Sequence, residues 1–225
     1  EGGSLSPILF QNYGSLLRYK GEIDAARLIY QHGLKLYPDD FSILTNQANL
    51  ELRERPCTAL KQYLYIFGRK IILDQDRQSL QSSLSAVINC MIELNLYLAP
   101  YQLLFKYIYL VDYNCSLTLY LLQLLYSPEL QSFCQQDEEQ LQLTFSQIDT
   151  QILSYSPADQ VELRFALAGT LSRQLKHKEA LKHYETGVNI ANLNLNNIDD
   201  KQQSTLKKSY TNHSWNFSIT LIKNQ

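Results

Sequence analysis

Apolar side chains recur at three- and four-residue spacing in the N-terminal part of the chain, which is the spacing of amphipathic helices. The first predicted helix runs from about Pro7, a residue suited to a first helical turn, to Tyr19. The second begins near Glu22, after a turn at Gly21, where glycine adopts positive φ without strain. Pro38 ends the unit because proline cannot continue a helix. The pattern therefore predicts a helical hairpin.

A second hairpin is predicted over residues 41–74, where the same pattern repeats after 34 residues. Asp40 or Ser42 is suited to cap its first helix, and Pro56 to begin its second. At this shift the small residue of the first helix is kept, whereas the small residues of the second helix are replaced by larger ones. The aligned pairs are Leu44 with Phe10, Ala48 with Gly14, Leu60 with Ala26, Leu64 with Tyr30 and Phe67 with Gly33.

Residues 75–156 lose this pattern but keep the helical period, so irregular helical hairpins are expected there. The expected helices cover residues 78–96, 101–111, 117–125 and 138–153.

The clear pattern returns over residues 157–192, which predicts another hairpin of the first kind. Residues 193–225 are then expected to form a loop and the first helix of an incomplete further repeat, and residues 1–6 to be a linker or a cloning scar. The residues that align with Tyr13, Gly14, Leu17, Ala26, Tyr30 and Gly33 are Leu167, Ala168, Leu171, Ala180, Tyr184 and Gly187.

The order aromatic–x3–Gly–x6–Gly–x4–Ala–x3–Tyr–x2–Gly–x4–Pro, from Phe10 to Pro38, resembles a tetratricopeptide repeat (TPR). The resemblance covers about half of the chain. It implies an all-α fold of stacked helical hairpins that form a right-handed superhelix, an α-α solenoid, with the first helix of each hairpin on the concave side.

Composition limits the possible functions. Hydrophobic residues make up 45% of the chain and charged residues 19%, which favours a folded chain. A net charge of −2 gives no basic footprint for nucleic acid. The most apolar stretch, Leu94–Tyr126, is interrupted by Pro100, Lys106 and Asp112, so we expect buried helices and not a membrane span. Four scattered cysteines and no secretory signal favour a cytoplasmic protein with reduced thiols.

Motifs for catalysis are missing from the sequence. It holds no glycine-rich phosphate loop, no GxSxG, no HExxH and no paired histidine and cysteine ligands. We therefore expect this segment to have no catalytic residues, no metal and no cofactor.

The remaining expectation is a peptide-binding surface on the first helices. Asn12 and Asn46 lie 34 residues apart, and Asn216 falls at the same position of the last expected helix. This resembles the asparagine ladder inside the TPR superhelix of O-GlcNAc transferases, in which amides clamp a peptide backbone. The alternative is that these asparagines cap or bridge locally.

A second kind of TPR site, the carboxylate clamp, matches less well. The clamp uses lysine, asparagine and arginine on adjacent first helices, and only Asn49 fits it well, so capture of an acidic chain terminus is not expected. The matching positions hold Gln11, Ser15, Ser42, Thr45, Asn49 and Arg53. The candidate peptide-binding residues are Asn12, Ser15, Asn46, Asn49, Arg53 and Asn216.

Three functional hypotheses follow. The first is a non-catalytic module that binds a peptide or protein segment on its concave surface. The second is the N-terminal substrate-recognition region of a bacterial TPR-containing glycosyltransferase, because the stretch SWNFSITL from Ser214 to Leu221 resembles the last repeat before the catalytic region of such enzymes. The third is a homo-oligomerisation module with Leu94–Tyr126 as the interface.

Overall fold

The structure is a computed structural model that describes residues 6–127, 130 and 138–194. Over these residues the chain forms α-helices and one 3-10 helix, and no strand. The chain divides into two compact units, residues 1–100 and 101–225. The last expected helix, with Asn216, lies outside the described residues.

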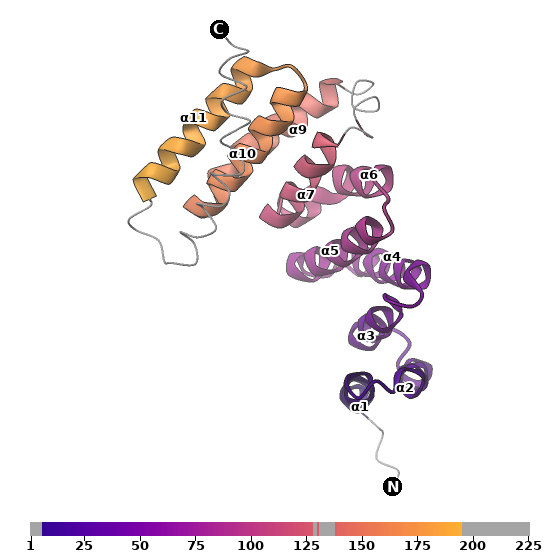
Figure 1. The fold of residues 1–225 in the computed structure, drawn as a ribbon. Coiled ribbons are helices and arrows are strands. Elements are labelled where there is room, and N and C mark those ends of the chain that lie inside the picture. Colours follow the sequence, from indigo (N-terminus) through magenta and orange to yellow (C-terminus); the bar gives the residue numbers. More distant parts are fainter. Residues whose placement is uncertain (1–5, 128–129, 131–137, 195–225) are drawn as a thin grey trace. The chain divides into compact units, whose positions relative to one another are not determined.

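Unit 1 is built of consecutive helices that pair into hairpins. Its helices are α1 (Pro7–Tyr19), α2 (Ile23–Leu36), α3 (Phe41–Glu51), α4 (Pro56–Ile72) and α5 (Arg77–Glu93), and α6 (Leu98–Tyr107) begins in its last residues. Aspartate caps start α3 and α5: the Asp40 carboxylate accepts from the Ile43 N–H at 2.8 Å, and the Asp76 carboxylate from the Ser79 N–H at 2.9 Å. In Figure 1, α1, α3 and α5 lie on one side of this unit and α2 and α4 on the other.

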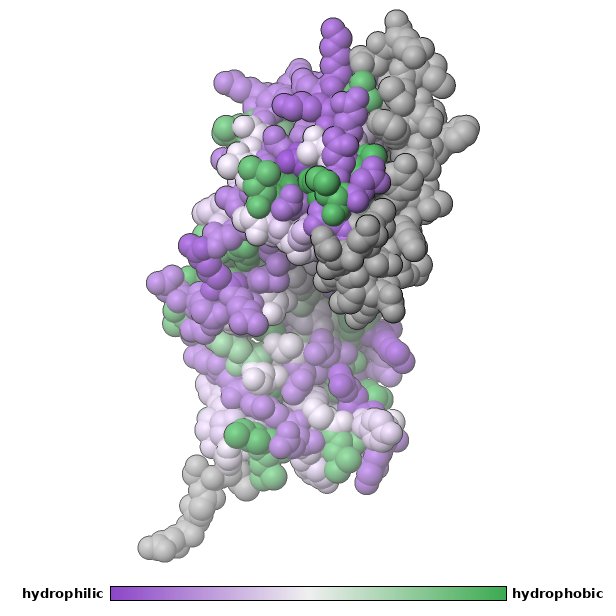
Figure 2. All heavy atoms as spheres, turned by 90° about the vertical axis from the view of Figure 1, so that its left-hand side faces the viewer, coloured by the Kyte–Doolittle hydropathy of each residue, from purple (hydrophilic) through white to green (hydrophobic). Residues whose placement is uncertain are grey.

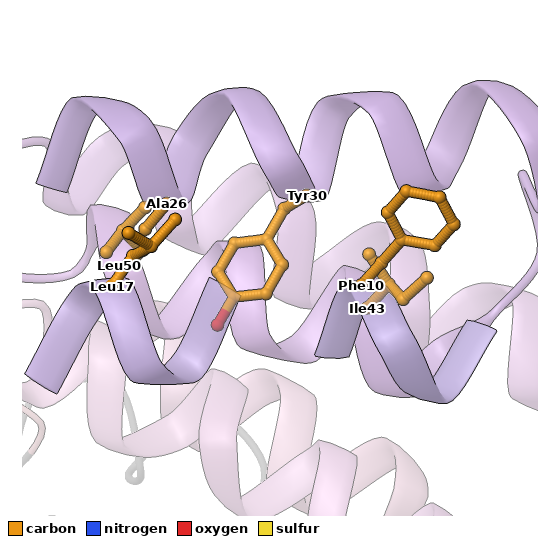
Figure 3. Packing of buried hydrophobic residues seen from close by; sticks show 6 residues of the cluster. All are labelled: Phe10, Leu17, Ala26, Tyr30, Ile43 and Leu50. Atoms are coloured by element: carbon orange, nitrogen blue, oxygen red, sulfur yellow. The ribbon is translucent and has the colours of Figure 1, made fainter. Parts of the chain in front are cut away.

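The core of the first hairpin is a row of apolar side chains that α3 closes. Figure 3 shows Tyr30 in the middle of the row, between the Phe10 end and the Leu17 end. Glycines leave the space that the aromatic rings occupy. A Cβ added at Gly14 would lie 2.3 Å from the Tyr30 ring, and one added at Gly33 would lie 2.9 Å from Phe10. The cluster consists of Phe10, Leu17, Ala26, Tyr30, Ile43 and Leu50.

The second hairpin has a different register from the one the 34-residue shift predicts. Ala59 and Tyr63 are buried in α4, whereas Leu64 is 38% exposed. The equivalents of Ala26 and Tyr30 are therefore Ala59 and Tyr63, one residue earlier, and the small residue of the second helix is kept. The expected replacement by a larger residue was therefore wrong for Ala26, whereas Gly33 is replaced by the large buried residue Ile66. The cause of this register is the start of α4 at Pro56. The interval from the start of α3 to the start of α4 is one residue shorter than the interval from the start of α1 to the start of α2.

An ion pair joins the first two hairpins. The Arg27 guanidinium of α2 donates to the Glu51 carboxylate of α3 at 2.7 Å, and only 3% of the Glu51 side chain is exposed. Asp24 and Glu54 also lie within 3.3 Å of Arg27. Glu51 stands where the other clear hairpins have the buried leucines Leu17 and Leu171, so this boundary is held by charge as well as by apolar contact.

Unit 2 contains the rest of α6, then η1 (Ile108–Val111), α7 (Cys115–Tyr126), α9 (Glu138–Ile152), α10 (Pro157–Arg173) and α11 (His177–Asn194). The late hairpin is α10 with α11. Ala168, Ala180 and Tyr184 are buried there, as the aligned pattern predicts. A Cβ added at Gly187 would lie 2.6 Å from the Phe165 ring, a contact similar to that of Gly33 with Phe10, although Phe165 stands one position later in its helix than Phe10.

The apolar stretch 94–126 mainly fills the interior of unit 2. Leu104, Leu117, Leu121 and Leu122 are fully buried. Among the side chains of this stretch that the structure describes, the large apolar ones that stay exposed are Leu96, Tyr97, Leu98 and Tyr109. No helix in the described residues is long and apolar enough to cross a membrane.

Candidate functional site

The candidate site is the surface of α1, α3 and α5 that points away from the buried side of each helix, here called the first-helix face. In each helix its residues are spaced by four, three and four positions, which places them on one side. It comprises Ile8, Asn12, Ser15 and Tyr19 of α1; Ser42, Asn46, Asn49 and Arg53 at α3; and Gln78, Ser82, Ser85 and Asn89 of α5. Figure 2 views unit 1 from the side on which these helices lie, and this side is mainly hydrophilic. Five of the six residues predicted from the sequence fall on this face.

Asn12 and Asn46 occupy the same position on consecutive first helices. Asn12 is exposed and Asn46 is half-buried. Neither side-chain amide makes a hydrogen bond to another described residue, so each offers one acceptor and two donors to a ligand. A local capping role, the alternative for these asparagines, finds no contact in the described part of the chain.

Ser15 and Asn49 have a second role that sequence reasoning missed. The Ser15 hydroxyl hydrogen-bonds the Tyr30 hydroxyl at 3.2 Å, and the Tyr63 hydroxyl donates to the Asn49 side-chain oxygen at 2.5 Å. Both contacts join a first helix to the tyrosine of its own hairpin. In the late hairpin the corresponding position is Gly169, which has no side chain to make this contact.

The atoms that meet fix the direction of the Tyr63 hydrogen bond, because the Asn49 side-chain oxygen can only accept. Burial, with the neighbouring Cys90 and Glu93, raises the pKa of Tyr63 to about 12, so the hydroxyl keeps its proton at neutral pH. The phenol donates and the Asn49 side-chain oxygen accepts. This hydrogen bond uses only the side-chain oxygen of Asn49, so the side-chain NH2 can still donate to a ligand.

The carboxylate-clamp positions are not brought together as a clamp. The Gln11 amide donates to the Asp40 carboxylate at 3.1 Å, which ties it to the N-terminus of α3. Arg53 is exposed just beyond the end of α3 and is the cation of the first-helix face as defined here. An arginine at one end of α3 and a glutamine already bound at the other end do not form the clamp.

The contribution of α5 was not predicted. Its four residues on this face, Gln78 to Asn89, are uncharged and polar, and Ser82 donates to the Gln78 carbonyl at 2.9 Å. The signal in the sequence was Asp76, a helix cap that follows the Asp40 cap by slightly more than one repeat. Aligning the caps instead of the core residues would have found the third helix of this face.

Titratable groups in unit 2 serve packing. The Arg164 guanidinium donates to Asp149 at 2.9 Å and lies 3.1 Å from His183 Nδ1. Burial lowers the pKa of His183. Burial, with nearby Asp159, raises the pKa of the Cys115 thiol to about 12, so it lacks the thiolate that cysteine chemistry uses. Within the described residues, no group of three His, Cys, Asp or Glu side chains could hold a metal ion.

Two solved structures that share this fold are similar to the chain at low sequence identity. One is the MamA protein, 14% identical with a TM-score of 0.57 over 85% of this chain and 94% of that chain. The other is YrrB, a TPR protein with an unusual peptide-binding site, 14% identical with a TM-score of 0.53 over 90% of this chain and 92% of that chain. No family model matches the sequence, and no curated protein matches it. The fold is thus an all-α solenoid of the TPR type, as the sequence predicts.

Proposed function

We propose that this chain is a non-catalytic protein-interaction module whose first-helix face binds an extended peptide. The observation that carries the proposal is the repeated pair Asn12 and Asn46, with free amides at one register on consecutive first helices. A side-chain amide can accept from a peptide N–H and donate to a peptide C=O at once. Such hydrogen bonds recognise the backbone of the peptide, so peptides with different side chains can bind.

The neighbouring residues favour a ligand with polar, uncharged contacts. The face offers hydroxyls and amides from three helices, with Arg53 as its cation. The YrrB protein, whose fold this chain shares, has a peptide-binding site, which is consistent with this use of the fold. The glycosyltransferase alternative rests on Trp215, Asn216 and their neighbours, which lie outside the described residues, and it stays a prediction. A cytoplasmic location and the absence of nucleic-acid partners stay predictions as well.

The test uses a phage-displayed library of random peptides panned on the full chain. Peptides that bind the wild-type chain are then titrated against the double variant Asn12→Ala/Asn46→Ala by fluorescence anisotropy. A lost hydrogen bond costs about 1 kcal/mol, so losing two to four of them in the double variant should weaken binding about 30- to 700-fold.

The matched control is the double variant Gln31→Ala/Gln62→Ala, which removes two amides from the second helices α2 and α4. Peptide binding should be unchanged in this control. Equal affinity of the wild-type chain and the asparagine variant would show that the peptides bind elsewhere and that the asparagine pair is not the site.

A further inference from the structure

The tyrosine in the second helix of each of the first two hairpins reaches the first-helix face with its hydroxyl. The Tyr30 hydroxyl lies 3.2 Å from the Ser15 hydroxyl, and the Tyr63 hydroxyl lies 2.5 Å from the Asn49 side-chain oxygen. Ser15 and Asn49 stand 34 residues apart, so they occupy the same position on consecutive first helices. Contact between a buried tyrosine and a side chain of this face is therefore a repeated feature of unit 1.

In the second hairpin this contact anchors an exposed amide. Tyr63 is buried, whereas Asn49 is exposed. Within the described residues the Tyr63 hydroxyl makes its hydrogen bond to the Asn49 oxygen, so turning the amide over would take that acceptor away from the phenol proton. An unmade hydrogen bond of a buried group is costly. The Asn49 amide is therefore held with its oxygen toward α4 and its NH2 toward the ligand side.

We infer that Asn49 donates a hydrogen bond to an acceptor oxygen of the bound peptide, and that Tyr63 is the positioning residue that makes this amide a donor only. This assignment rests on the proposed function, since it concerns the same face and the same peptide. The acceptor is a backbone carbonyl or an acidic side chain, because both offer oxygen lone pairs and no N–H.

The neighbours of Asn49 on α3 fit such an acceptor. Three residues separate Asn46 from Asn49, about 4.5 Å along the helix. One residue of an extended peptide spans roughly 3.3–3.6 Å, so a peptide held at Asn46 brings an oxygen of the same or the next residue to Asn49. Arg53, four residues after Asn49, also carries donors and no acceptor. The C-terminal half of α3 on this face thus selects acceptors, whereas Asn46 serves both an N–H and a C=O.

The first test is Asn49→Asp, titrated by fluorescence anisotropy against the peptides selected on the wild-type chain. Aspartate keeps an oxygen for the Tyr63 hydroxyl but has no N–H, so the anchor stays and the donor is lost. A lost hydrogen bond costs about 1 kcal/mol, so binding should weaken at least about fivefold. The matched control, Gln31→Glu, makes the same chemical change at an exposed residue of α2 and should bind like the wild type.

The second test separates positioning from a purely structural role of Tyr63. Tyr63→Phe should weaken peptide binding about two- to fivefold when Asn49 is present and should have no effect in an Asn49→Ala background. All variants are compared at equal folded fraction, which urea denaturation of each variant provides. A tyrosine that only stabilises the hairpin would change binding by the same factor in both backgrounds, and that result overturns the positioning role.

Changes in the peptide identify the acceptor. Replacing acidic residues of the peptide by their amides weakens binding if a carboxylate is the acceptor, and a thioamide at one backbone position weakens it if a carbonyl is. In either case the loss should vanish in Asn49→Ala, and peptides that show no such coupling overturn the inference.

The asparagine pair separates this inference from the proposed function. If Asn12→Ala/Asn46→Ala loses the peptide but Asn49→Asp binds like the wild type, the role of Asn49 is wrong and the proposed site stands. If neither variant weakens binding, the first-helix face is not the peptide site and both proposals are wrong.

Discussion

Gly14→Ala tests the packing of the first hairpin most directly, because it adds one methyl group against one ring. In the interior of a helix this change ordinarily stabilises by about 1 kcal/mol, since alanine loses less conformational freedom than glycine. At Gly14, however, the new Cβ would lie 2.3 Å from the Tyr30 ring. That is more than about 1 Å short of normal carbon contact.

The ring has little freedom to withdraw. Tyr30 is fully buried, and its hydroxyl is held by Ser15. Overpacking of this kind costs about 1–3 kcal/mol, and the severity of the overlap places it in the upper half of that range. After subtracting the gain in helix propensity, we expect Gly14→Ala to lower the free energy of unfolding by about 1–2 kcal/mol.

The assay is urea denaturation followed by far-UV circular dichroism, with hydrogen exchange of α1–α2 peptides to localise the effect. Gly68→Ala is the matched control, because Gly68 also lies inside a helix but an added Cβ meets nothing within 4 Å. It should stabilise by up to about 1 kcal/mol. The reasoning is refuted if both substitutions stabilise to the same extent.

Three further predictions concern charge and hydrogen bonding. Arg27→Ala leaves the buried Glu51 carboxylate without its main partner and should destabilise by about 2–4 kcal/mol in urea denaturation, whereas replacing both residues by leucine should recover much of the loss. Because burial lowers the pKa of His183, the unfolded state binds more protons below about pH 6.5, so stability should fall as pH drops from 7 to 5, and His183→Gln should flatten that slope in pH-dependent melts. Tyr63→Phe removes the donor to Asn49 and should cost about 0.5–1.5 kcal/mol by the same denaturation assay; no change would mean that this hydrogen bond is not formed in solution.

The sequence predicts the first and last hairpins well, because the spacing of small and aromatic residues there indicates which side chains touch each other. Gly14 and Gly33 are small since Tyr30 and Phe10 fill the space beside them, and these pairs can be recognised by spacing alone. The helix starts at Pro7 and Pro56 can be predicted equally well, because proline suits the first turn of a helix.

The second hairpin was placed one residue out of register for a reason that lies in its turn. A fixed 34-residue shift cannot detect that α4 starts earlier, and it assigned the core to Leu64 in place of Tyr63. The same error hid part of the candidate site. With Tyr63 assigned to the wrong side of α4, its hydrogen bond to Asn49 could not be expected.

The ion pair between Arg27 and Glu51 restricts the order in which these hairpins can follow one another. The residue that follows the buried alanine of the second helix is Arg27 in α2, but it is Leu60 in α4 and Leu181 in α11. A hairpin that begins with α3 would bury Glu51 with only the largely exposed Arg55, 3.8 Å away, as counter-ion if it followed either of those helices. The hairpins of this chain are therefore not interchangeable building blocks: shuffling them would fail at this junction unless arginine and glutamate moved together.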